Sequence, residues 1–470
     1  MRDQQTNHSK RTCLWDALCS GGECGGQIIA GSEATVFQRD LIEGSTLYNR
    51  AHELCGQNVL LATASQLTTA SALIELDGLA RRIVVCPPDL PLDELPYVID
   101  TAEVDAIVSD REIHHFGSVR KLLFSPCSQR IVPRASERYA ACQSEWILLT
   151  SGTTGLPKLV VHTLETLAGA IGRGDRPSKS VVWSTFYDVR RYGGLQVLLR
   201  AVLTRTSLVL CNAQEPISAF LARCAAHGVT HMSGTPSHWR RALMSPSVRL
   251  VAPEYVRLSG EIADQSILNN LRTAFPQARI VHAFASTEAG VAFEVADGAA
   301  GIPVATLQNT PDVEMKLQDG SLRVRSARNA CCYLGIESPP VKDGDGFVDT
   351  GDVLELRGGR YHFVGRRDGV INVGGIKVHP EEIESVINRH PAVRMSLVRT
   401  KKSSITGSLV IADVVLQGAH QGTGSNTGAL RDDILLLCRK SLSAHKVPAA
   451  INFIPELSIA ESGKLLRRNA

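Results

Sequence analysis

Short runs of apolar residues alternate with longer amphipathic stretches over the first 280 residues. The runs are rich in Val, Ile and Leu and predict buried strands, whereas the stretches between them have the length and periodicity of helices. The first predicted helices occupy about 65–80 and the segment after Pro91. Strands are predicted at 59–61, 83–86, 105–108, 147–150, 181–183, 207–210, 229–232 and 280–281. Strands that alternate with helices predict a parallel sheet covered by helices, and hence an α/β fold.

The pattern changes after residue 312, where paired strands are separated by tight turns. Asp319-Gly320 and Gly358-Gly359 are residue pairs that two-residue hairpin turns favour. The hairpin strands are predicted at 313–317, 322–324, 353–356 and 361–364. Beyond Arg367 the remaining residues predict a small α/β module. The polar, glycine-rich segment 1–40 predicts a poorly ordered extension.

Composition narrows the classes of partner. The 470 residues carry a net charge of only +3 without a basic cluster of nucleic-acid type, so nucleic acid is not an expected partner. No apolar run approaches the ~18 residues of a membrane span, and residues 1–24 lack an apolar signal core. We therefore expect a cytoplasmic protein. Its 12 cysteines are scattered without metal-ligand spacing and read as small buried hydrophobes, the adjacent Cys331 and Cys332 included.

The most informative segment follows the predicted strand at 147–150. Glycines let a backbone approach an anion closely, hydroxyls donate hydrogen bonds, and a lysine adds a mobile positive charge. All three kinds of residue occur here, as Ser151, Gly152, Thr153, Thr154, Gly155 and Lys158. A Walker loop needs four residues between its glycines, and here there are two. The segment therefore predicts a phosphate-binding loop of another kind.

This loop resembles the phosphate-binding signature of the adenylate-forming superfamily, which includes acyl- and aryl-CoA ligases, adenylation domains of peptide synthetases, and luciferases. Four further segments resemble the superfamily's motifs in the same order along the chain. They are Phe284 to Glu288, Asp349 to Asp352, Gly365 to Asp368 continuing through Glu384, and Ser462 to Lys464. The resemblance covers about residues 45–470. It implies an AMP-binding N-terminal domain over 41–366, with parallel α/β sheets and a β-barrel-like subdomain, and a small mobile C-terminal α/β domain over 367–470.

The resemblance also implies roles for individual residues. Glu288 would bind Mg²⁺, Thr287 would contact the α-phosphate, and Phe284 stands where relatives stack a tyrosine on adenine. Asp352 would accept the two ribose hydroxyls, and Arg366 would meet the ribose or the phosphates. Ser259-Gly260-Glu261 loosely resembles the loop beside the adenine.

The C-terminal domain carries the remaining implied roles. Lys464 would bridge the attacking carboxylate and the α-phosphate, where a positive charge between two anions lowers the barrier. Asp368 lies at the superfamily's hinge position, and Gly374 and Gly375 correspond to the loop that faces the pantetheine channel.

The substrate pocket is the least ordinary part of the sequence. Many acyl- and aryl-CoA ligases have a histidine-containing aromatic motif here, whereas this chain has none in Phe186 to Gly194. Asp188 could bind an amino group of the substrate, and Arg190 or Arg191 could bind a second carboxylate. Alternatively, each of the three is an ordinary surface charge. The histidines at 162, 231, 282 and 379 have no partner spacing and are predicted to be structural or surface residues.

Together these features predict an AMP-forming acid–thiol ligase. It would use ATP and Mg²⁺ to activate a small carboxylic acid as an acyl-adenylate and would then transfer the acyl group. Coenzyme A is the favoured acceptor; the phosphopantetheine of an acyl carrier protein and an amine are alternatives. A non-catalytic nucleotide-binding homologue is a rival, against which the joint presence of Lys158, Thr287, Glu288, Asp352 and Lys464 argues.

Overall fold

The computed structural model describes residues 13–20, 26–112, 122–135, 138, 140–150, 156–172, 180–335, 340–373, 376–403, 407–417, 427–458 and 465. The chain divides into two compact units. Unit 1 comprises Met1–Met232, Ser286–Val291 and Ala327–Gly346, and unit 2 comprises Ser233–Ala285, Ala292–Ser326 and Phe347–Ala470. The domain boundary predicted at residue 367 differs from this division and stays a prediction.

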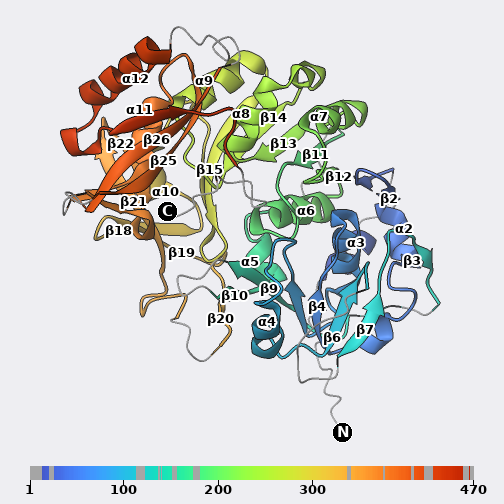
Figure 1. Cartoon of the computed structure of the whole chain (residues 1–470). Coiled ribbons are helices and arrows are strands. Elements are labelled where there is room, and N and C mark those ends of the chain that lie inside the picture. Colours follow the sequence, from blue (N-terminus) through green and yellow to red (C-terminus); the bar gives the residue numbers. More distant parts are fainter. Residues whose placement is uncertain are drawn as a thin grey trace. The chain divides into compact units, whose positions relative to one another are not determined.

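Unit 1 contains a seven-stranded sheet with the strand order β20-β10-β9-β5-β4-β6-β7 (Figure 1). Its strands are β4 (Asn58–Leu61), β5 (Arg82–Val85), β6 (Ala106–Ser109), β7 (Leu123–Pro126), β9 (Glu145–Thr150), β10 (Lys158–Thr163) and β20 (Cys332–Tyr333). β4 pairs in parallel with β5 and β6, and β5 pairs in parallel with β9. The predicted parallel sheet is therefore confirmed.

Two helices cover this sheet because of how its strands are connected. α3 (Gln66–Leu76) joins β4 to β5, and α4 (Leu95–Thr101) joins β5 to β6 in the opposite direction across the sheet. Right-handed crossovers then require the two helices to lie on opposite faces. Val98 and Ile99 of α4 pack on Leu60, Ile107 and Ile147 in one buried cluster.

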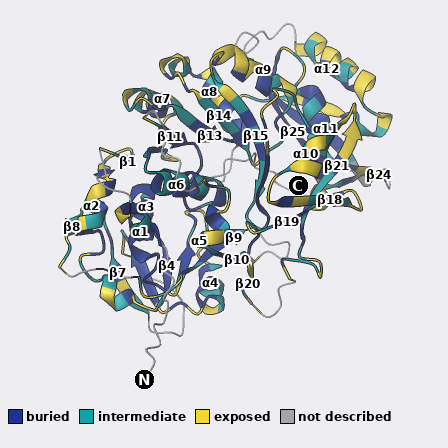
Figure 2. Ribbon diagram, turned by 180° about the vertical axis from the view of Figure 1, so that it is seen from behind, coloured by how far each residue is buried: buried dark blue, intermediate teal, exposed yellow. Residues whose placement is uncertain are grey.

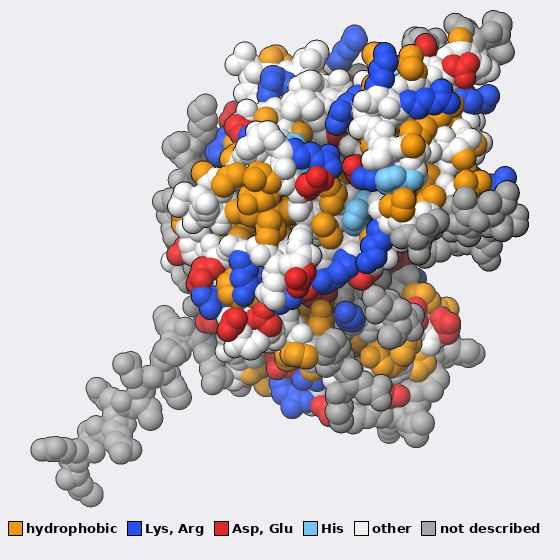
Figure 3. Space-filling view, turned by 90° about the vertical axis from the view of Figure 1, so that its left-hand side faces the viewer, with side chains coloured by type: hydrophobic (Ala, Val, Ile, Leu, Met, Phe, Trp, Pro, Cys, Tyr) orange, Lys and Arg blue, Asp and Glu red, His pale blue; other side chains and the backbone are white. Residues whose placement is uncertain are grey.

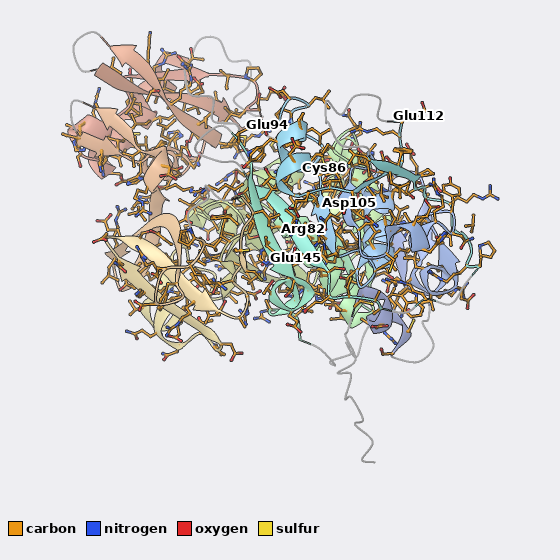
Figure 4. All side chains as sticks on the ribbon, turned by 90° about the horizontal axis from the view of Figure 1, so that it is seen from below. Arg82, Cys86, Glu94, Asp105, Glu112 and Glu145 are labelled. Carbon is orange, nitrogen blue, oxygen red and sulfur yellow. The ribbon has the colours of Figure 1, made fainter. Side chains whose placement is uncertain are left out.

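Hydrogen bonds from charged side chains join the amino ends of these strands. Arg82 begins β5 and donates to Glu145, which begins β9, at 2.9 Å, and Figure 4 shows the two side chains close together. Asp105, just before β6, accepts a hydrogen bond from the Asn58 N–H at 3.0 Å. These contacts stabilise the sheet and leave ligand chemistry to the carboxyl ends, where loops follow the strands.

A second group of paired strands in unit 1 includes two strands from the N-terminal region. β1 (Ile28–Ala30) pairs in parallel with β12 (Ser207–Leu210) and antiparallel with β2 (Thr35–Phe37), and β12 also pairs in parallel with β11 (Val182–Thr185). Unit 1 also contains α2 (Gln38–Glu43), β3 (Gly44–Ser45), η1 (Ala51–Leu54), β8 (Val132–Pro133), α5 (Leu164–Ala168), α6 (Tyr192–Thr204) and α7 (Ile217–Ala226). Strand β13 (His231–Gly234) crosses the boundary between the units.

The expectation of a poorly ordered extension over residues 1–40 is wrong for its described part. Besides β1 and β2, helix α1 (Leu14–Cys19) forms there, with Leu14 and Leu18 fully buried. The buried Asp77 carboxylate accepts hydrogen bonds from the Leu14 N–H at 2.8 Å and from the Trp146 indole at 3.1 Å. Burial raises the pKa of Asp77 to about 6. Spaced leucines and one distant carboxylate thus order a segment whose polar, glycine-rich composition suggested otherwise.

Unit 2 begins with α8 (Pro236–Met244), η2 (Pro246–Leu250), β14 (Tyr255–Ser259), α9 (Gln265–Ala274) and β15 (Arg279–Ser286), and β14 and β15 pair in parallel. A five-stranded half-barrel follows, in the order β17-β22-β21-β19-β18. β16 (Gly290–Val295) precedes the half-barrel and belongs to another sheet. The elements of the half-barrel region are β17 (Ile302–Pro303), α10 (Val304–Asn309), β18 (Val313–Gln318), β19 (Ser321–Ser326), β21 (Val348–Arg357) and β22 (Arg360–Arg366). The predicted barrel-like hairpins are confirmed.

The end of unit 2 is a small α/β module. A three-stranded sheet, β25-β26-β27, packs with two helices around a shared apolar core that includes Val378, Ile383 and Ile434. Its elements are η3 (Arg367–Gly369), β23 (Ile371–Val373), β24 (Ile376–Val378), α11 (Pro380–Ile387), β25 (Val393–Ser403), β26 (Gly407–Leu416), α12 (Thr427–Ser441), η5 (Ala444–Lys446) and β27 (Ala450–Phe453). Strand β26 is mostly buried, whereas Figure 2 shows many exposed residues on α12. None of the described helices has the length and apolar character needed to cross a bilayer.

Candidate active site

The predicted phosphate loop lies between two strands that pair with each other. β9 and β10 pair antiparallel, and their register places Thr150 opposite Lys158. The residues from Ser151 to Gly155 lie outside the described residues, so their predicted contacts with phosphate stay predictions. The pairing nevertheless holds the two residues that flank the loop at the carboxyl end of β9.

Glu288 lies beside these two residues. Its Oε1 atom accepts long hydrogen bonds from the Thr150 hydroxyl at 3.3 Å and the Tyr333 hydroxyl at 3.4 Å. The Lys158 ammonium lies 5.1 Å from the centre of the Tyr333 ring, within range of a cation–π interaction. Unit 1 thus gathers a lysine, a carboxylate and two hydroxyls from β9, β10, β20 and the turn after β15.

This donor set suits a magnesium nucleotide. Mg²⁺ takes one or two carboxylates together with substrate phosphate oxygens and water. Among the described residues, no group of three or more His, Cys, Asp or Glu side chains is placed to hold a metal by itself. The single carboxylate of Glu288, with a lysine and hydroxyls nearby, fits a cation that arrives with phosphate.

His162 supports the turn that carries Thr287 and Glu288. Its ring is fully buried on β10, with Nδ1 at 2.9 Å from the Thr166 hydroxyl and Nε2 at 2.7 Å from the Thr287 carbonyl oxygen. Burial lowers the pKa of His162 to about 4, although the bond to Thr287 opposes this shift. The ring is therefore neutral near pH 7, and Nε2 donates to the Thr287 carbonyl. The prediction of a structural histidine is confirmed.

The burial of His162 predicts a pH effect on stability. An unfolded histidine has a pKa near ~6.5, so below that pH the unfolded state takes up a proton that the folded state excludes. The free energy of unfolding should fall as the pH drops toward 4, by up to ~1.4 kcal/mol per pH unit from this group. The His162→Gln variant should lose this contribution. Urea unfolding of both proteins at pH 7 and pH 5 measures it, and an identical pH dependence would contradict the assignment.

Unit 2 holds the residues predicted to bind the nucleoside. Phe284 lies nearly parallel to Phe293 and Phe363, with ring centroids 5.7 and 5.3 Å away. Asp352 on β21 stands opposite Arg366 on β22, and the Asp352 N–H donates to the Thr350 hydroxyl at 3.1 Å. The aromatic cluster fixes the Phe284 ring. Its stacking on adenine stays a prediction.

The predicted hinge follows this strand pair directly. Asp368 is exposed in η3, and the preceding Arg367 donates to the Asp349 carboxylate at 2.7 Å. Burial raises the pKa of Asp349, but hydrogen bonds from Arg367, Ser321 and the Gly351 N–H outweigh it and lower the pKa below its ordinary value. Gly374, Gly375 and Lys464 lie outside the described residues. Val373 and Ile376, which flank the two glycines, pair across β23 and β24.

The charged pocket candidates bind each other. Asp188 and Arg190 are 7% and 5% exposed, and the Asp188 carboxylate accepts from Arg190 Nε at 2.8 Å and Nη2 at 2.5 Å. Arg190 Nη1 donates to the carbonyl oxygens of Thr63 and Ala64. Arg191 donates to Asp89. Each of the three side chains therefore has a protein partner within unit 1.

A groove of about 660 Å³ lies on the half-barrel and contains none of the predicted site residues. Phe347 lines it, with Lys316 and Arg325 4.2 and 4.7 Å from the centre of its ring. Figure 3 views the side on which β18 lies in Figure 1, and hydrophobic patches there are interspersed with lysine and arginine.

Fold and site together have the organisation of a nucleotide-using ligase: a parallel sheet whose edge carries lysine, hydroxyls and carboxylate, followed by a half-barrel and a small α/β module. The chain belongs to the AMP-binding enzyme family, whose model matches residues 79–329, and the family's C-terminal domain matches residues 382–464.

The sequence identity to individual relatives is below 30% in the following comparisons. The chain is 29% identical over 362 residues to the 2-succinylbenzoate–CoA ligase of Salmonella typhimurium, covering 73% of each protein. It is 26% identical over 393 residues to the human mitochondrial acyl-coenzyme A synthetase ACSM4, covering 74% of this chain and 66% of the relative. The crystal structure of a benzoate CoA ligase from Burkholderia xenovorans superposes with a TM-score of 0.81 at 18% identity, covering 97% of this chain and 98% of that one. At that identity the superposition establishes the fold.

Proposed function

We propose that this protein activates a carboxylic acid with ATP and transfers the acyl group to the thiol of coenzyme A. In the first step a carboxylate oxygen attacks the α-phosphorus of ATP, and pyrophosphate leaves as the acyl-adenylate forms. In the second step the thiol sulfur attacks the acyl carbon, AMP leaves, and the thiol proton passes to solvent. The observation that carries the proposal is the joining of Lys158 and Glu288 through Tyr333 in a chain of the AMP-binding family.

Each of the main predicted site residues would have its own part in this reaction. Lys158 and the hydroxyls of the loop before it would bind phosphate oxygens, and Glu288 would hold Mg²⁺, which neutralises phosphate charge when bound. Asp352 would accept the ribose hydroxyls. Lys464 would stabilise the charge that develops between the carboxylate and the α-phosphate.

We also propose that the acid bears no charge other than its carboxylate. The three charged side chains predicted to read a second charge are Asp188, Arg190 and Arg191, and each is engaged by a protein partner. Recognition by Asp188 or Arg190 would require breaking their buried pair, and an unpaired buried charge is costly. Recognition by Arg191 would require breaking its partly exposed pair with Asp89. Aliphatic or aromatic monocarboxylic acids are therefore the expected substrates.

Acid-dependent exchange of radioactive pyrophosphate into ATP tests the first step. Exchange should appear with fatty or aryl monocarboxylic acids and be much weaker with amino acids and dicarboxylic acids, and Glu288→Gln should reduce it strongly. Nucleotide binding without exchange for any acid would favour a non-catalytic homologue. Product analysis with coenzyme A, a phosphopantetheinylated carrier protein and an amine, each supplied separately, then identifies the acceptor.

A further inference from the structure

Glu261 joins two distant parts of unit 2 through its two carboxylate oxygens. Oε2 accepts a hydrogen bond from the Ser237 N–H at 2.9 Å, and Oε1 accepts one from the Leu465 N–H at 3.1 Å. Ser237 lies in the first turn of α8, whereas Leu465 lies 204 residues beyond Glu261 along the chain. One side chain therefore connects a helix start to a segment near the end of the sequence.

The α8 side of this contact is firmly held. The first backbone N–H groups of a helix have no partners within the helix, and a carboxylate there also interacts favourably with the helix dipole. Thr235 caps the same turn by accepting from the His238 N–H at 3.0 Å, and the Trp239 indole donates to the Arg257 carbonyl on β14 at 3.2 Å. These contacts hold α8 against β14, and Glu261 lies just after the end of β14.

The position of Leu465 in the sequence relates this contact to the proposed reaction. Leu465 is joined directly to Lys464, the proposed catalytic lysine. We propose that Glu261 is a positioning residue that anchors the lysine-bearing segment through the Leu465 N–H during acyl-adenylate formation. This inference rests on the proposed function, and it assigns Glu261 to the adenylation step and not to acyl transfer. A hydrogen bond to a charged acceptor is strong enough to matter at this position.

Two substitutions can remove the contact from opposite sides. Glu261→Ala deletes the acceptor, and Leu465→Pro deletes the donor while leaving Glu261 intact. Leu465→Ala retains the N–H and serves as the matched control. Pyrophosphate exchange reports adenylation, and thioester formation from supplied acyl-adenylate and coenzyme A reports transfer.

Exchange should fall roughly tenfold in Glu261→Ala and in Leu465→Pro, in line with the loss of one charge-assisted hydrogen bond, whereas transfer should stay within about twofold in Leu465→Pro, which leaves the loop of Glu261 unchanged. The double variant should exchange pyrophosphate no more slowly than the slower of the two single variants, since both changes break the same contact. Leu465→Ala should resemble the wild type. Equal loss of both half-reactions in Leu465→Pro, or additive losses in the double variant, would overturn the inference.

Limited trypsin digestion tests the anchor without using activity. Cleavage after Lys464 should be roughly tenfold faster in Glu261→Ala than in the wild type, because the same contact protects the bond. An unchanged cleavage rate would overturn the inference. A wild type that protects this bond but exchanges no pyrophosphate with any acid would instead refute the proposed function.

Discussion

Replacement of Asp188 by alanine should lower the free energy of unfolding by about 3–5 kcal/mol, because it leaves the Arg190 guanidinium buried without its counter-ion. The pair is almost inaccessible to solvent, and the lost carboxylate takes both side-chain hydrogen bonds with it. Urea denaturation at pH 7 measures the loss. A change below 1 kcal/mol would mean that the loop rearranges to expose Arg190.

Two further variants separate this explanation from a general effect of the loop. Asp188→Ala combined with Arg190→Met replaces the ion pair by apolar groups and should recover at least half of the lost stability. Glu314→Ala removes a carboxylate from an exposed ion pair with Arg325 and should cost less than about 1 kcal/mol. Failure of the double variant to recover stability would show that the hydrogen bonds to the Thr63 and Ala64 carbonyls dominate.

Replacement of Lys464 by alanine should reduce pyrophosphate exchange by roughly 10²- to 10³-fold, comparable to removing one preorganised donor from a transition state. Thioester formation from supplied acyl-adenylate should be nearly unaffected, because the phosphoryl transfer is already complete. Lys440→Ala, at the exposed end of α12, is the control for loss of a surface lysine. Comparable losses in both half-reactions would contradict the proposed division of labour.

The sequence predicted most of the architecture because its strong signals are local. Apolar runs between helices gave β4, β5 and β6, and Asp-Gly and Gly-Gly turns gave the hairpins of the half-barrel. The N-terminal residues were misjudged for the opposite reason. Leu14 is buried against partners far away in the sequence, and its N–H binds Asp77. No pattern within residues 1–40 encodes such contacts.

The site was predictable only where a motif carries it. Glu288 and Lys158 belong to recognisable segments, and the structure brings them together. Tyr333, which lies between them, is in a two-residue strand paired with β10 and gave no signal of its own. The pairing of Asp188 with Arg190 was equally hidden, since a two-residue separation does not reveal that a loop folds one side chain onto the other. Burial, not residue type, decides whether such charges are available to a ligand.

The parallel pairing of β1 with β12 sets an order on folding during synthesis. Ile29 pairs with Leu208, so β1 has no neighbour on that side until about 180 further residues have left the ribosome. Helix α1 has the same constraint, because the guanidinium of Arg205 donates to the Ala17 and Leu18 carbonyls at its end. Long-range contacts of this kind form late. The contacts of β1 and α1 with this region can therefore form only after residues 205–209 have been synthesised.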